Sequence, residues 1–74
     1  MIAEIEDFKT GWYGLFLRFD PDEIDRLILS LQLVKNGKIG HFHLLDDHAS
    51  EKSGIADIEI SLKGKDELDN MRIP

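Results

Sequence analysis

The sequence contains no cysteine, which excludes disulfides, thiolate metal ligands and a thiol nucleophile. No apolar run approaches the roughly 20 residues that a membrane-spanning helix needs. Residues 1–7 have neither the basic nor the apolar region of a signal peptide. We therefore expect a cytoplasmic protein that does not associate with membranes, and the absence of cysteine agrees with that compartment.

Clustered basic residues are also missing. The chain has 9 Lys and Arg residues against 15 Asp and Glu residues, giving a formal net charge of −6, and the basic residues are scattered. Neutralising phosphates requires a patch of Lys and Arg, so we expect no nucleic acid ligand. An acidic surface suits a basic protein partner, although it also serves simply to keep a small domain soluble.

Recognisable catalytic arrangements are absent as well. There is no G-x-S-x-G motif and no glycine-rich phosphate loop, and the serines have no evident base beside them. We therefore predict a non-enzymatic protein with no cofactor.

The 74 residues are enough for one domain, 1–74. A chain of this size buries only about 60% of the surface that its unfolded form exposes. Its core supplies about 3–5 kcal/mol of net stability. A metal ion, a protein partner or a second copy of the chain are the remaining sources of stability.

The strongest pattern is a hairpin of two strands, Ile39–Leu45 and Ile55–Leu62, with a polar loop at Asp46–Gly54. Alternating side chains point to opposite faces of a strand. The predicted register gives one apolar face and one face that is mostly His and acid. The apolar pairs are Phe42–Ile58 and Leu44–Ala56, and the pairs on the other face are His41–Glu59, His43–Asp57 and Leu45–Ile55.

The first half of the chain predicts two more strands and a helix. The strands are Ile2–Phe8 and Trp12–Phe19, with a turn at Thr10-Gly11 that would set Ile5 opposite Leu17 and Glu4 opposite Arg18. Asp20 is a helix cap, Pro21 suits the first helical position, and Asn36-Gly37 ends the helix after Lys35. Helical spacing predicts a core stripe of Ile24, Leu27, Ile28, Leu31 and Val34.

The order strand, strand, helix, strand, strand predicts an α+β fold. We expect a two-layer ββαββ arrangement, in which a mainly antiparallel four-stranded sheet carries one helix on one face. A right-handed crossover through the helix would place the third strand parallel to the second.

The His-x-His strand raises the possibility of a metal site. His41 and His43 point the same way, Asp57 and Glu59 face them, and His48 lies in the nearby loop. Two histidines and a carboxylate suit zinc or iron. The same residues also suit ordinary cross-strand pairs, worth a few tenths of a kcal/mol, or a protein contact.

A protein interface is the other candidate site. Trp12 and Phe16 would share the open face of the sheet with the histidines, unless Trp12 closes the end of the core. Leu29 and Leu33 lie outside the core stripe, where Met71 and Ile73 of the tail, or a second copy, could cover them. We predict an interface formed by Trp12, Phe16, Leu29, Leu33, His41 and His43, and a homodimer.

The stretch Pro21–Leu62 resembles a family of small bacterial immunity proteins of polymorphic toxin systems, immunity protein family thirty-two. The likeness is carried by the helical Asp-Glu-Ile-Asp-Arg-Leu at 22–27, the Asn36-Gly37 exit and the strand His41-Phe42-His43-Leu44, followed by an Ile-rich strand. The resemblance implies a cytoplasmic protein that binds and blocks a toxin enzyme. We therefore predict an interaction module, with a small metal-binding protein or a structural homodimer as alternatives.

Overall fold

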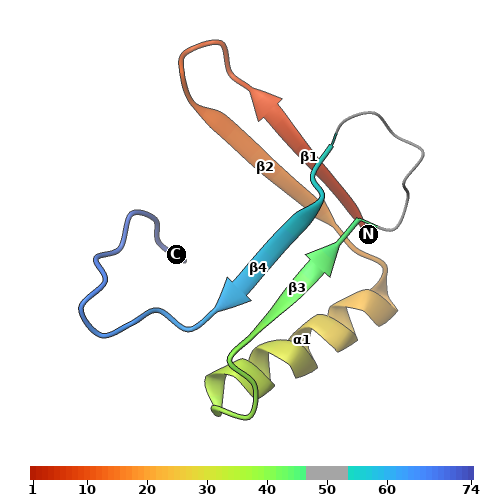
Figure 1. Ribbon diagram of the computed structural model, residues 1–74. Helices are drawn as coiled ribbons and strands as arrows, with labels where there is room; N and C mark the ends of the chain where they lie inside the picture. Colours follow the sequence, from red (N-terminus) through yellow and green to blue (C-terminus); the bar gives the residue numbers. More distant parts are fainter. Residues whose placement is uncertain (47–53) are drawn as a thin grey trace.

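The computed structural model describes residues 1–46 and 54–74, and it has the predicted order of elements (Figure 1). These are β1 (Ile2–Asp7), β2 (Tyr13–Arg18), α1 (Pro21–Lys35), β3 (His41–Leu45) and β4 (Asp57–Ser61). The α+β class is thereby confirmed. Among the described residues, no helix has the length and apolar character needed to traverse a lipid bilayer.

The predicted four-stranded sheet is wrong. The described residues form two separate antiparallel sheets, β1–β2 and β3–β4, and β2 does not pair with β3. The β1–β2 ribbon instead projects away from α1, β3 and β4 (Figure 1). A right-handed crossover through α1 permits β2 to lie beside β3 but supplies no contact that holds it there.

The β1–β2 register differs from the predicted one by two residues. Ile5 lies opposite Leu15 rather than Leu17, so that Thr10 and not Gly11 is at the centre of the turn. The turn is held by the Phe8 N–H, which donates to the Trp12 carbonyl oxygen at 3.2 Å. Lys9 adopts a left-handed φ of 62°, and its N–H donates to Asp7 Oδ1 at 2.8 Å.

The helix begins and ends as predicted because its signals are local. Asp20 and Glu23 form a capping box, Pro21 is the first helical residue, and the Asp20 N–H donates to Glu23 Oε1 at 2.8 Å. At the other end Gly37 has a φ of 72°, and the N–H groups of Lys38 and Ile39 both donate to the Leu33 carbonyl oxygen. The Leu33 carbonyl is thereby satisfied after the helix ends.

The predicted core stripe of α1 is covered on one side. Val34 is buried at 4% exposure and Leu27 is half-buried. The remaining members keep large exposed fractions: Ile24 39%, Ile28 48% and Leu31 43%. In Figure 1, β3 lies between α1 and β4, so that no strand underlies the far side of the helix. We call Ile24, Ile28 and Leu31 the helix stripe.

The β3–β4 register is also two residues from the predicted one, yet the two faces are as predicted. Phe42 lies opposite Ile60 and Leu44 opposite Ile58, whereas His43 lies opposite Glu59 and His41 opposite Ser61. Phe42, Leu44, Ile58 and Ile60 are half-buried, and the alternate residues are exposed. A shift by an even number of residues leaves every side chain on its own face, so the apolar pattern could not distinguish the two registers.

The chain exposes more surface than a folded monomer of its size. Its accessible area is 7036 Å² for 8.5 kDa, whereas a monomer of that mass is expected to expose about 4,700 Å². Its radius of gyration is 14.4 Å, against about 11 Å for a compact 74-residue domain. The molecule therefore has an incomplete core.

Candidate functional site

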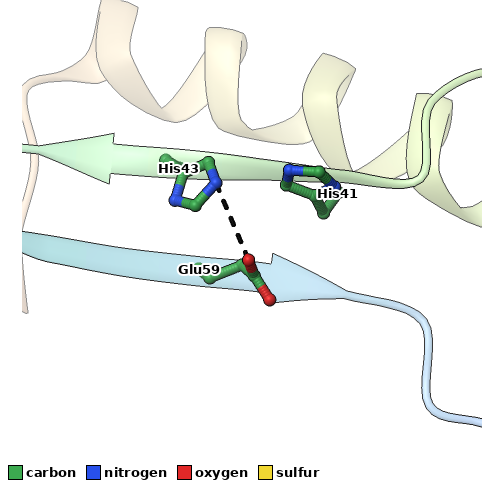
Figure 2. A group of neighbouring side chains, drawn as sticks. All are labelled: His41, His43 and Glu59. Atoms are coloured by element: carbon green, nitrogen blue, oxygen red, sulfur yellow. Dashed lines mark ion pairs between the residues drawn. The ribbon is translucent and has the colours of Figure 1, made fainter.

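The polar candidate site lies on the open face of β3 and β4. We call His41, His43, Asp57 and Glu59 the histidine face. Figure 2 shows the rings of His41 and His43 next to each other on β3, with Glu59 across from them on β4. The ring centroids are 5.0 Å apart and the planes are nearly perpendicular, at 88°. The alternation of β3 directs both rings to this side, because Phe42 and Leu44 occupy the other.

His43 contacts two carboxylates. Its Nδ1 lies 2.8 Å from Asp57 Oδ1, and its Nε2 lies 3.7 Å from Glu59 Oε1 (Figure 2). Asp57 is opposite Leu45 in the ladder, so the shorter contact is diagonal. The three side chains are between 34% and 55% exposed. Such partly solvated pairs each contribute only a few tenths of a kcal/mol.

The histidine face has the composition of a metal site. His41, His43 and Glu59 each offer a ligand atom, and these atoms lie within 4.8 Å of one another. Donor atoms around one tetrahedral zinc ion are about 3.3 Å apart, so the side chains must close by rotating. Asp57 would then accept from Nδ1 of His43 and orient that ring, as carboxylates do behind metal-bound histidines. His48 lies outside the described residues.

The second candidate site is apolar and lies on the β1–β2 ribbon. The register places Ala3, Ile5, Tyr13, Leu15 and Leu17 on one side, which we call the hairpin face. Ile5 is 62% exposed and Leu15 is 53% exposed, although both belong to residue types that are usually buried. Alternation alone does not distinguish these residues from those of a covered strand, so they are not among the predicted interface residues.

The reverse side of the ribbon is partly filled by its own aromatic rings. A Cβ atom built on Gly14 would lie 2.8 Å from the Phe8 ring and 3.3 Å from the Phe16 ring. The space beside Gly14 is thus occupied by Phe8, while Phe16 remains 43% exposed.

The predicted interface residues do not gather in one place. Trp12 lies at the β1–β2 turn and is 76% exposed, whereas the histidines lie on the other sheet. On α1, Leu29 is 56% exposed and Leu33 is half-buried. The tail does not cover them, because Met71 and Ile73 are almost fully exposed.

One ion pair joins the start of β1 to the start of α1. The Met1 ammonium group lies 2.6 Å from Glu23 Oε2. This hydrogen bond and the one from the Asp20 N–H lower the pKa of Glu23, because both stabilise the ionised carboxylate. A hollow that opens to solvent adjoins this pair and is lined by Met1, Phe19, Leu27, Phe42 and Leu44, among others.

Comparison with known proteins adds no identification. No protein-family model, curated protein or solved structure matches this chain. The histidine face, the hairpin face and the helix stripe are therefore the features from which a function can be inferred.

Proposed function

We propose that this protein is a non-enzymatic interaction module that completes its core by binding another protein chain. The observation that carries the proposal is the apolar surface left open on the hairpin face and the helix stripe. Large exposed apolar patches on a soluble chain mark sites of protein contact. The net charge of −6 adds a preference for a basic surface around that contact.

The narrower form of this proposal is an immunity role, in which the chain binds and blocks a toxin enzyme in the cytoplasm. Its support is the resemblance of Pro21–Leu62 to immunity proteins of polymorphic toxin systems and the acidic charge balance. Many toxins that act on nucleic acids need a basic surface to bind their substrate. An acidic module could occupy such a surface.

The test is binding between this chain and the product of the neighbouring reading frame. Calorimetry should give a 1:1 complex whose affinity falls as salt is raised, because acidic groups contribute to the contact. Ile5→Glu on the hairpin face should weaken the complex at least tenfold, while Leu29→Glu on the far side of α1 serves as the matched control. A gene without any toxin-like neighbour would contradict the immunity role.

A second candidate function is metal binding at the histidine face, and the convergence of His41, His43 and Glu59 favours it. Zinc titrated into the protein at neutral pH should bind with micromolar affinity or better. His43→Ala should abolish binding. Asp57→Asn should weaken it about 10–100-fold through loss of ring orientation, whereas Glu4→Gln on the other sheet should have no effect. A calorimetric titration that shows no zinc binding at micromolar concentrations would exclude this function.

A further inference from the structure

The helix stripe lies where a strand is missing. Within the described residues β3 pairs with β4 along one edge and has no strand along the other. Because β3 lies between α1 and β4 in Figure 1, one side of the helix reaches past the free edge of β3. Ile24, Ile28 and Leu31 recur at helical spacing and share that exposure. A helix surface of this kind normally packs on a sheet.

The hairpin face complements the helix stripe, since it is an apolar sheet surface on which no helix of the described part of the chain packs. An isolated two-stranded ribbon is marginally stable in water unless its apolar face is packed against something. Ile5, Tyr13 and Leu15 are each more than half exposed. The same chain therefore presents a helix with one side left uncovered by a sheet, and a sheet that lacks a helix.

We propose that the covering partner is a second copy of this chain, with the hairpin face of each copy packed on the helix stripe of the other. This inference rests on the proposed role as an interaction module, for which it names a second copy as the partner in place of a toxin, because both would occupy the hairpin face. The exchange is reciprocal, because each copy gives a ribbon and receives one. It therefore closes around a two-fold axis without leaving either surface open.

The available area is sufficient for a stable dimer. The chain exposes about 2,300 Å² more than a compact monomer of its mass. Part of this excess belongs to the segment after β4, where Leu68, Met71 and Ile73 are exposed. A standard interface needs roughly 800 Å² per partner, about a third of this excess, and the total also includes residues outside the described ranges.

The charge distribution permits contact between two acidic copies. The helix stripe contains no charged residue, and the hairpin face has one, Asp7, which lies opposite Tyr13 at the end of the ribbon near the turn. The remaining acids of the ribbon, Glu4 and Glu6, are on its reverse side, where Glu4 pairs with Arg18 at 2.8 Å. Apart from Asp7 at the end of the ribbon, the proposed contact therefore contains no acidic residue that would repel the other copy.

Disulfide cross-linking tests this arrangement cleanly, because the natural chain has no cysteine. The double variant Leu15→Cys/Ile28→Cys places one thiol on the hairpin face and one on the helix stripe. The matched control is Leu15→Cys/Leu29→Cys, since Leu29 has a similar exposed fraction but lies outside the stripe. Mild oxidation is followed by mass measurement under denaturing conditions, and light scattering gives the mass of the unsubstituted chain.

The expected result is an unsubstituted chain with twice the 8.5 kDa monomer mass. The Leu15/Ile28 variant should form a covalent dimer at least tenfold faster than the control. Mixing Leu15→Cys with Ile28→Cys should also give a cross-linked pair. A dimer in which both double variants cross-link equally fast would overturn the proposed docking.

Two other outcomes separate this inference from the interaction module itself. A disulfide within one copy would mean that the ribbon folds back on its own helix, and both proposals would then fail. A monomer that forms no disulfide would overturn self-association, yet it would leave both apolar surfaces open to a different protein.

Discussion

His43 makes its shortest contact with a residue that is not directly opposite it in the β3–β4 register. Glu59 is directly across from His43, but Asp57 makes the shorter contact, at 2.8 Å. Side chains in strands lean along the strand, so diagonal neighbours are within reach of a ring. The predicted pairing of His43 with Asp57 is therefore observed as a contact even though the predicted register is wrong.

Because this pair is partly solvated, removing it should change stability little. We expect His43→Leu/Asp57→Leu to alter the free energy of unfolding by less than about 0.5 kcal/mol. Urea unfolding monitored by circular dichroism would measure it. A loss of several kcal/mol would show that a partner covers the histidine face.

Val34 should behave in the opposite way, since its side chain is buried at 4% exposure. Val34→Ala removes two buried carbon atoms from the side chain and should lower the free energy of unfolding by about 2 kcal/mol. Leu29→Ala is the control and should remain within about 0.5 kcal/mol, because Leu29 is 56% exposed. Equal costs for the two variants would contradict the orientation of α1.

At the level of elements, the helix could be predicted almost to the residue whereas the strand registers could not. Asp20, Pro21 and Asn36-Gly37 define the helix ends through contacts with their own neighbours. A register depends instead on how a turn is built, and the turn around Thr10 includes a left-handed Lys9 that alternation does not indicate. The faces were predictable because a shift of two residues preserves them.

The N-terminal cap of α1 should make stability sensitive to acid. The pKa of Glu23 lies below its usual 4.5 because the Met1 ammonium and the Asp20 N–H stabilise its ionised form. A lowered folded-state pKa contributes stability above the unfolded pKa, and this contribution is lost as the pH falls through the lower value. We therefore expect the unfolding free energy of the natural chain to fall more steeply with decreasing pH, below about pH 4.5, than that of the Glu23→Gln variant.

Urea unfolding at a series of pH values measures this difference. Asp22→Asn in the same turn is the control, because Asp22 makes no contact with the ammonium group in the structure. Parallel curves for the natural chain and Glu23→Gln would show that the ion pair does not contribute to folding.

At the level of the whole molecule, the sequence predicted the elements but not how the ribbon is placed. A crossover through α1 allows β2 to lie beside β3, and the same residues allow a ribbon from another copy to take that position. Local propensity and alternation are identical in the two arrangements, so neither could decide between them. The exposure of Ile5, Leu15 and Ile28 follows from the placement of the ribbon, which is a property of the three-dimensional arrangement.

If two copies complete each other, thermal stability must depend on concentration. Mass action links folding to association, so each tenfold dilution should lower the Tm by about 5 °C. Circular dichroism at concentrations spanning two orders of magnitude would measure this shift. A Tm that is independent of concentration would indicate that a single copy folds on its own.

The segment that follows β4 has one more consequence. Its polar contacts, Lys63 with Asp69 and Gly64 with Glu67, join residues of the segment itself, and Leu68 is 94% exposed. A trypsin-like protease could therefore cleave after Lys63 or Lys65 without opening a strand. Cleavage there would remove three highly exposed apolar side chains, Leu68, Met71 and Ile73, and would leave β1–β4 intact.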